Sequence, residues 1–302
     1  MSDTERAVPT IPIGEWVQAG VDALLEHGQP VFDVVVRVID GLTTLLEGAL
    51  LALPAWVFTI VLAGLGAWRL GLRFAVFVLV AMGIVAGMDL WVETIATLAL
   101  VLAATLMSLL IGVPLGIWSA RYDTVWQGLR PVLDFMQTMP AFVYLIPAVM
   151  FFSTGKVPGT IATIIFAMPP SVRLTNLGIR HVSNEMVEAG LAFGCTPRQL
   201  LFKVQLPAAI PSIMAGINQT IMLALSMVVI ASMIGAGGLG DVVLRGIQRL
   251  DVGLGFEGGL GVVILAIILD RITQSFGDRH RQSLLQRLRA AFAEVSGRDG
   301  PG

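Results

Sequence analysis

The sequence predicts an all-α protein that crosses a membrane several times. Hydrophobic residues make up 56% of its 302 residues and charged residues only 13%, which is about half the charged share of a water-soluble domain. The apolar residues form long runs, as membrane-spanning helices require. The single cysteine excludes an intrachain disulfide, and the three histidines have no metal-ligand spacing. The sequence also has no phosphate-binding loop and no paired catalytic residues. We therefore expect a chain that is not an enzyme and holds no metal or cofactor.

Seven apolar stretches approach the roughly 20 residues that cross a hydrocarbon core about 30 Å thick. We expect about seven spans, at residues 50–68, 72–90, 93–119, 131–153, 157–178, 208–234 and 258–276. The first two, within 49–92, would be peripheral, and the five within 93–276 would form the core. Residues 277–302 would be a basic tail.

Two amphipathic stretches precede the first span. Apolar residues recur at helical spacing from Ile13 to Leu25, and again from Phe32 to Ala49. Neither stretch is apolar enough to span the bilayer. We expect residues 1–48 to be a tail with two amphipathic helices, which either lie on the membrane surface or pack on the bundle. A soluble cap or a dimer contact is the alternative.

The basic residues predict which side of the membrane each loop occupies. Basic side chains gather in alternate loops and after the last span, namely Arg69, Arg73, Arg121, Arg130, Arg180, His181, Arg198, Lys203, Arg271, Arg279, Arg281, Arg287 and Arg289. The positive-inside rule places these segments and the C-terminus in the cytoplasm and the N-terminus outside. The tail is a basic amphipathic stretch, which predicts either a simple anchor or a contact with anionic lipid.

A polar segment at residues 183–207, which we call the elbow, separates two long apolar runs. Thr196, Pro197 and Gln199 form a capping box with proline at the first helical position. Gly194 suits the end of a preceding short helix. The elbow is therefore predicted to be a helix, a glycine hinge and a second helix ending at Leu206 and Pro207. It is either a knob that docks into a soluble partner or an ordinary re-entry loop.

Polar residues and prolines inside the spans indicate a translocation path. The candidates are Gln137, Thr138, Pro140, Asn218, Gln219 and Ser226. Intramembrane polar side chains either line a water-filled route or form hydrogen bonds between helices, and both remain open for Asn218 and Gln219. Asp270 next to Arg271, and likewise Asp134, lie near the interface, which favours local pairing. The centres of the spans contain no clear acid that could couple transport to an ion, so we expect the driving energy to come from a partner.

The elbow resembles a signature of bacterial ATP-binding-cassette importers. That signature is Glu-Ala-Ala, three residues, Gly, nine residues, then Ile-x-Leu-Pro. Here it is Glu188-Ala189-Gly190, then Gly194, then Val204 to Pro207, with the full spacing and two mild substitutions. The resemblance covers about residues 93–276 and implies a MetI-like, type I importer permease core. It also implies that the elbow docks on a cytoplasmic ATPase, which binds and hydrolyses the nucleotide.

More closely, the chain resembles permease subunits of glycine betaine/proline betaine osmoprotectant importers. The resembling stretches are residues 133–147, 164–174, 200–206, 214–234 and 237–250. The resemblance implies a homodimer in the bacterial inner membrane, two ATPase copies and an external substrate-binding protein, with no nucleic-acid partner. The expected coupling residues are Glu185, Glu188, Ala189, Gly190, Leu191, Phe193, Gly194, Leu206 and Pro207, with Leu191 and Phe193 as inferred docking knobs.

Alternative functions keep part of this architecture. The same permease could import choline, carnitine or another small solute, or the chain could be a self-powered secondary transporter. We predict no aromatic cage for a quaternary ammonium group in this chain. Tyr144, Phe142, Phe135 and Trp118 are interpreted mostly as packing residues.

Overall fold

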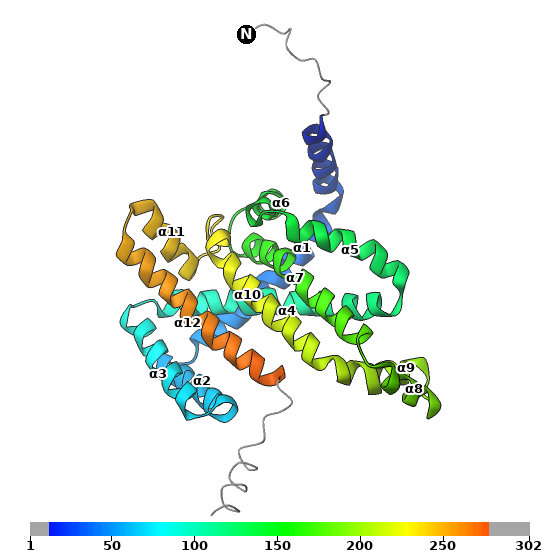
Figure 1. Cartoon of the computed structure of the whole chain (residues 1–302). Coiled ribbons are helices and arrows are strands. Elements are labelled where there is room, and N and C mark those ends of the chain that lie inside the picture. The colour runs from blue at the N-terminus through cyan, green and yellow to red at the C-terminus, as the bar shows by residue number, and fades with distance from the viewer. Residues whose placement is uncertain (1–11, 278–302) are drawn as a thin grey trace, which may run out of the picture.

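The computed structural model describes residues 12–277, and every regular element within them is helical. Figure 1 shows these helices arranged as a bundle, with one end of the first helix extending away from it. The elements are α1 (Ile13–Leu51), α2 (Ala55–Leu70), α3 (Leu72–Gly87), α4 (Trp91–Arg121), α5 (Asp123–Thr138), η1 (Ala141–Tyr144), α6 (Leu145–Phe152), α7 (Lys156–Arg180), α8 (Asn184–Ala192), α9 (Pro197–Leu200), η2 (Leu201–Gln205), α10 (Leu206–Ser232), α11 (Leu239–Arg249) and α12 (Val252–Gly277). The predicted all-α membrane class is confirmed.

Helix α7 is the centre of the bundle because it packs along both α4 and α10. Small residues make these close approaches possible. A Cβ atom added to Gly116 of α4 would stand 2.6 Å from the Thr175 Cβ atom and 2.8 Å from the Val172 carbonyl oxygen. On the other side of α7, a Cβ atom at Gly178 would stand 2.7 Å from the Ser212 Cβ atom of α10. Any larger residue at these glycines would push the helices apart.

Short polar side chains join α4 and α7 in addition to the glycine contacts. The Ser108 hydroxyl donates to the Ile164 carbonyl oxygen at 3.2 Å, and the Asn176 side-chain amide donates to the Ser119 hydroxyl at 2.9 Å. Each such bond within a membrane contributes about 0.6 kcal/mol on average. These bonds satisfy part of the buried polar surface, while the buried hydroxyls of Thr105 in α4 and Thr175 in α7 have no hydrogen-bond partner among the described residues.

The α2–α3 hairpin and α12 cover another side of the bundle. The fully buried side chains of Val78 and Val85 from α3 lie in one apolar cluster with Leu265 and Ile268 from α12 and Ile95 from α4. At the end of the hairpin, the Arg69 guanidinium lies 4.1 Å from the centre of the Phe276 ring and donates to the Ser275 carbonyl oxygen at 3.1 Å. The hairpin is therefore attached to the end of α12.

The number of helices suited to span a membrane is smaller than predicted. Within residues 12–277, four helices are long and apolar enough, or up to six if two bent helix pairs each count as one span. The predicted spans 50–68 and 72–90 correspond to α2 and α3, which have only 16 residues each. Sixteen residues rise about 24 Å, which is less than the hydrocarbon thickness. The expected count of about seven exceeds what length and composition support.

The predicted span 131–153 is broken in the structure. Helices α5 and α6 meet at an angle of 108°, and the chain between them is extended at Met139 and Pro140. A proline disfavours the helical conformation of the residue before it, which explains why α5 stops at Thr138. In contrast, Pro169 and Pro170 lie within the continuous helix α7.

The two predicted N-terminal stretches form one continuous helix, α1, despite Pro30 inside it. A single proline removes only one backbone donor, and packing of the second half of α1 offsets that loss. Ile39 is buried against Ala104 of α4 and Ile161 of α7, and the Glu47 carboxylate pairs with the Lys156 ammonium at 2.6 Å. The second half of α1 therefore packs on the bundle, which is one of the arrangements expected for the amphipathic stretches. The predicted basic tail beyond residue 277 lies outside the described residues.

We expect Gly116→Ala to destabilise the bundle, because the new Cβ atom would meet backbone and Cβ atoms that cannot swing away. Overpacking of this kind costs about 1–3 kcal/mol. The measurement is the thermal unfolding midpoint of the purified protein in detergent. Gly83→Ala in α3 is the matched control, since no heavy atom lies within 4 Å of its added Cβ. Equal midpoints for the two variants would contradict the close α4–α7 packing.

Candidate functional site: the elbow and an α10 cavity

The first helix of the elbow ends in a Schellman motif. The amide of Gly194 donates to the Leu191 carbonyl oxygen at 2.9 Å, and the amide of Cys195 donates to the Gly190 carbonyl oxygen at 3.0 Å. These are the two bonds that define the motif, and they require a left-handed residue just after the helix. Gly194 has φ of 78°, which a residue with a Cβ atom adopts only at a cost. The predicted glycine hinge is present.

The predicted capping box is also present at the start of α9. The Thr196 amide donates to the Gln199 side-chain oxygen at 2.9 Å, and the Gln199 amide donates to the Thr196 hydroxyl at 3.3 Å. The second elbow helix, however, does not end at Leu206 and Pro207 as predicted. It passes through one π-helical turn, η2, and continues directly into α10. Pro207 stands at the beginning of α10, where it does not terminate the helix.

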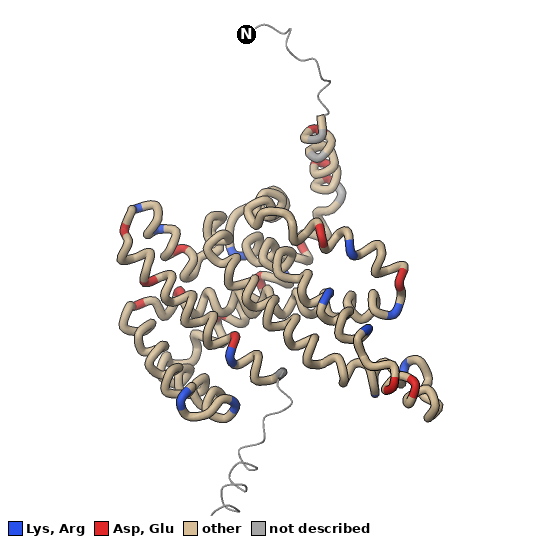
Figure 2. Tube along the Cα trace, in the orientation of Figure 1, with Lys and Arg blue, Asp and Glu red and all other residues tan. Residues whose placement is uncertain are grey.

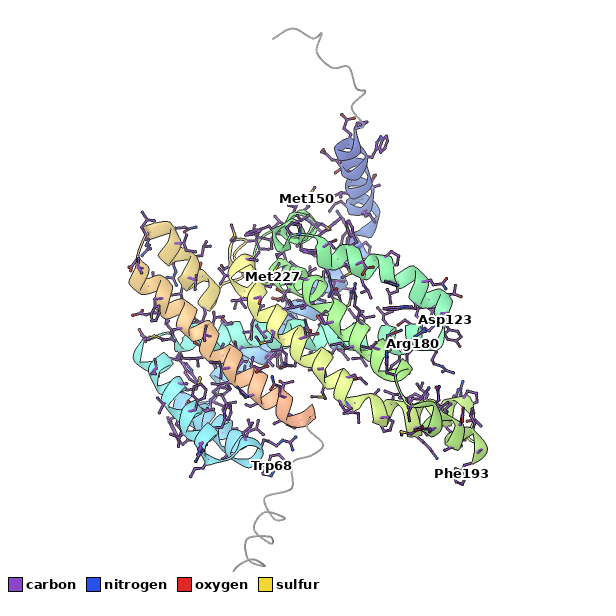
Figure 3. All side chains as sticks on the ribbon, in the orientation of Figure 1. Trp68, Asp123, Met150, Arg180, Phe193 and Met227 are labelled. Carbon is purple, nitrogen blue, oxygen red and sulfur yellow. The ribbon has the colours of Figure 1, made fainter. Side chains whose placement is uncertain are left out.

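Apolar side chains on the elbow are exposed. Phe193 has 90% of its surface accessible, Leu191 54% and Met186 47%. Figure 3 shows Phe193 at the outer tip of the elbow, away from the bundle. Glu185 and Glu188 are exposed on the same short helix, α8. The elbow therefore presents apolar side chains and carboxylates together on a surface that the other residues within 12–277 do not cover.

Other predicted elbow residues hold the elbow in place. Gly190 is buried, and a Cβ atom there would stand 2.8 Å from the end of the Leu200 side chain. Leu206 packs against a buried cluster of Ile179, Leu201 and Ala209. These contacts join α8 to the segment that leads into α10. Gly190 and Leu206 are thus positioning residues rather than surface contacts.

Charged pairs fix the part of the bundle next to the elbow. Figure 2 shows charged residues mainly near the ends of the long helices and in the elbow. Arg180, at the end of α7, pairs with Asp123 at 2.6 Å and also donates to the Ser119 carbonyl oxygen at 2.9 Å. Arg173 pairs with Asp134 of α5. The expected local pairing of Asp134 is found, since it pairs with Arg130 in its own helix and with Arg173 of α7.

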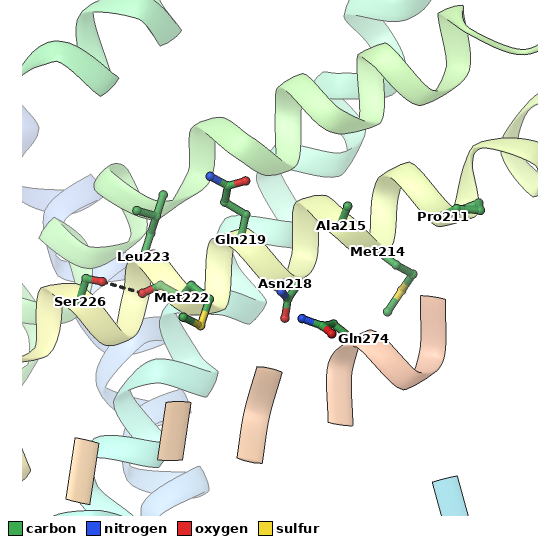
Figure 4. A pocket seen from close by; sticks show the side chains of 9 residues that line it. All are labelled: Pro211, Met214, Ala215, Asn218, Gln219, Met222, Leu223, Ser226 and Gln274. Carbon is green, nitrogen blue, oxygen red and sulfur yellow. Dashed lines mark hydrogen bonds between the residues drawn. The ribbon is translucent and has the colours of Figure 1, made fainter. Parts of the chain in front are cut away.

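A cavity of about 700 Å³ lies along one face of α10 (Figure 4). Its lining residues are spaced three or four apart on α10, with one contribution from α12. They are Pro211, Met214, Ala215, Asn218, Gln219, Met222, Leu223, Ser226 and Gln274. Three of the predicted path residues, Asn218, Gln219 and Ser226, are therefore brought together. The cavity lining combines amide and hydroxyl groups with methionine and other apolar side chains.

Asn218 both lines the cavity and joins two helices. Its side-chain amide donates to the Asp270 carboxylate of α12 at 2.8 Å, and the Gln274 amide donates to the same carboxylate oxygen at 2.7 Å. Asn218 therefore fits both open interpretations, since it lines a cavity and also forms a hydrogen bond between two helices. The expected pairing of Asp270 with Arg271 is wrong, because the ion pairs among residues 12–277 do not include Asp270.

The other three predicted path residues lie elsewhere. Gln137, Thr138 and Pro140 are exposed where α5 ends before η1, and they do not line the α10 cavity. Gln274 was missed by sequence reasoning. The helical spacing of polar residues from Asn218 to Ser226 reveals a face of α10, but the sequence does not show which helix forms the opposite wall.

The aromatic residues agree only in part with their interpretation as packing residues. Tyr144 is buried against Phe166, and its hydroxyl donates to the Met136 carbonyl oxygen. Trp118, Phe135 and Phe142 are each more than half exposed. The residues that line the α10 cavity include no aromatic side chain.

The sequence comparison decides the family. Residues 112–282, which include α7, the elbow, α10 and α12, match a family described as "Binding-protein-dependent transport system inner membrane component". The chain belongs to this family. It is therefore a multi-pass inner-membrane component of a transport system, and membership implies a substrate-binding protein and an ATPase as partners.

Named relatives in the family cover most of the chain. The chain is 54% identical over 88% of its length to the glycine betaine/proline betaine transport system permease protein ProW of Escherichia coli, of which the match covers 75%. It is 51% identical over 90% of its length to the glycine betaine/carnitine transport permease protein GbuB of Listeria monocytogenes, of which the match covers 98%.

A solved structure shows the same fold. A chain of the inward-facing MetNI methionine ABC transporter aligns with a TM-score of 0.53 at 22% identity, covering 61% of this chain and 90% of that chain. At this identity the likeness concerns the fold alone. It confirms the predicted MetI-like architecture.

We expect Gly194→Ala to loosen the elbow, because alanine is strained at φ of 78° by about 1 kcal/mol or more. The measurement is the rate of tryptic cleavage at Arg198 and Lys203 in the purified protein, which should rise severalfold. Gly128→Ala in α5 is the control, since no heavy atom lies within 4 Å of its added Cβ. A cleavage rate that is unchanged in Gly194→Ala would contradict the role of the hinge.

Proposed function

We propose that this chain is the permease subunit of an ATP-driven importer for small quaternary ammonium solutes, with glycine betaine and proline betaine as the main cargo. The observation that carries the proposal is sequence identity. Over about nine tenths of its length, the chain is 54% and 51% identical to two permeases named for glycine betaine transport. The α10 cavity supports it, because amide and hydroxyl groups line it along a helix that is long and apolar enough to span a membrane.

In this proposal the nucleotide is bound and hydrolysed by a separate cytoplasmic ATPase. Two copies of the permease form a homodimer around a central path, and each copy docks one ATPase through the elbow. Glu188, Ala189, Gly190 and Gly194 carry the coupling motif, while Leu191 and Phe193 are the docking side chains. Their exposure supports the docking role, since exposed apolar groups next to charges are typical of protein-binding surfaces.

The proposed orientation places the elbow and the end of α12 in the cytoplasm and the N-terminus outside. In Figure 1 the elbow helices α8 and α9 and the end of α12 lie on the lower side, whereas α11 and the start of α1 lie on the upper side. This separation supports the positive-inside assignment. We propose that the chain has two peripheral helices within 49–92, a permease core within 93–276 and a cytoplasmic tail from 277. The second half of α1 packs on the core.

The function is tested by reconstituting the permease in proteoliposomes with its ATPase and its substrate-binding protein. We expect uptake of labelled glycine betaine that requires ATP and is abolished by an inactive ATPase. Uptake of labelled carnitine and labelled choline, measured in parallel vesicles, would show which solute is transported best. Uptake that persists with the inactive ATPase but collapses with the ion gradient would instead support a secondary transporter and contradict the proposal.

We expect Phe193→Asp to weaken assembly with the ATPase about tenfold or more, as removal of a central apolar anchor does. Glu188→Lys should reduce assembly as well by reversing a charge on the docking surface. The measurement is the amount of ATPase that co-purifies with the permease. Leu250→Asp is the matched control, because Leu250 is 88% exposed but lies in the turn between α11 and α12. Normal ATPase binding by Phe193→Asp would argue against docking at the elbow tip.

A further inference from the structure

Asp270 is a carboxylate held next to the α10 cavity by two of the residues that line it. One of its oxygens accepts hydrogen bonds from both Asn218 and Gln274, and both of these residues line the cavity. Figure 4 shows the Asn218 and Gln274 side chains directed toward each other from α10 and α12. Asp270 lies in the last third of α12, and ionisable side chains in membrane helices usually face the bundle interior or a water-filled cavity.

The carboxylate is not neutralised within the described chain. The ion pairs among residues 12–277 do not include Asp270, and its sequence neighbour Arg271 is exposed. The two bonded side chains supply amide hydrogens but no positive charge. Within residues 12–277 no ion pair offsets the charge of Asp270, so this charge can attract a cation that enters the cavity.

The bonding around Asp270 is not arranged for maximum stability. The Asn218 amide oxygen is buried and has no hydrogen-bond partner among the described residues. Rotating the amide would bring this oxygen against the carboxylate, so the amide is fixed with its hydrogens toward Asp270. A buried oxygen without a partner is uncommon in folded proteins, although the Thr105 and Thr175 hydroxyls are further examples among the described residues. The bond that Asn218 donates to Asp270 orients the carboxylate beside the cavity.

The lining of the cavity indicates which cation would enter. A metal ion would need several oxygen ligands, whereas residues 12–277 contain no group of three or more His, Cys, Asp or Glu side chains placed to hold one. A quaternary ammonium group needs no hydrogen-bond acceptor and is attracted by a diffuse negative charge and polarisable surfaces. The sulfur atoms of Met214 and Met222 supply such surfaces, and Gln219 offers an amide to a carboxylate at the other end of a zwitterion.

We propose that the α10 cavity binds the quaternary ammonium group of the transported solute weakly, with the Asp270 carboxylate, oriented by Asn218 and Gln274, as the counter-charge. This inference rests on the proposed function and adds a specific cation-selecting residue to it. The lack of aromatic side chains in the lining keeps the binding weak, which suits a passage that the solute must leave as readily as it enters.

The substitution Asp270→Asn separates the effect of the charge of Asp270 from the effect of its hydrogen bonds. Asparagine keeps one oxygen that accepts both hydrogen bonds but removes the charge. The probes are choline and its neutral carbon analogue 3,3-dimethyl-1-butanol, which differ in the charged nitrogen. Their binding to the purified permease in nanodiscs is compared by saturation-transfer difference NMR.

We expect the wild-type permease to favour choline over the neutral analogue by about tenfold or less, as one partly screened charge provides. Asp270→Asn should bind the two probes equally while keeping the thermal unfolding midpoint of the wild type. Asp241→Asn is the control, because Asp241 pairs with Arg245 in α11 and does not line the cavity. It should leave the preference for choline unchanged.

Uptake measurements distinguish failure of this inference from failure of the proposed function. ATP-dependent glycine betaine uptake in proteoliposomes should show a severalfold higher KM in Asp270→Asn, with ATPase assembly unchanged. If Asp270→Asn retains both the choline preference and normal uptake, the cation site is overturned although the importer function stands. If the wild type shows no ATP-dependent betaine uptake, the proposed function fails, whatever the NMR result.

Discussion

The structure depends on the close approach of α7 to α4 and α10. Helices in a membrane gain little from the hydrophobic effect when they pack against each other, so van der Waals contact and hydrogen bonds must hold them together. Gly116 and Gly178 remove the side chains that would separate the helices, and Ser119 and Asn176 use the short distance for a hydrogen bond. This tight centre carries both functional features, since α7 leads into the elbow and α10 bears the cavity.

The elbow is connected to that centre by polar contacts on one side and by a continuous helix on the other. Arg180 joins the last turn of α7 to the end of α4 and to Asp123, and η2 continues the elbow into α10 without interruption. A displacement of the elbow tip would therefore be transmitted along α10 to the cavity face. In the proposed function, this helical continuity and the Leu206 cluster would link docking of the ATPase to transport.

Local features of the sequence predicted local structure well. Gly194 and the capping box at Thr196 were recognisable because helix ends depend on bonds between residues a few positions apart. The polar face of α10 was visible from its spacing. The bond between Asn218 and Asp270 was not, because it joins residues 52 positions apart and no periodicity encodes it. The predicted number of spans was too high for two reasons. Helices α2 and α3 are shorter than the apolar runs that contain them, and hydropathy does not show that the chain bends between α5 and α6.

The π-helical turn at η2 stores one residue more than an α-helical turn would contain. Each residue of an α-helix turns the chain by about 100°. Converting this turn to α-helical bonding would therefore swing the elbow around the axis of α10 by about that angle while the helix stays unbroken. The exposed Phe193 would then face a different direction. A change of bonding at this one bulge would thus reorient the elbow without melting any of its secondary structure.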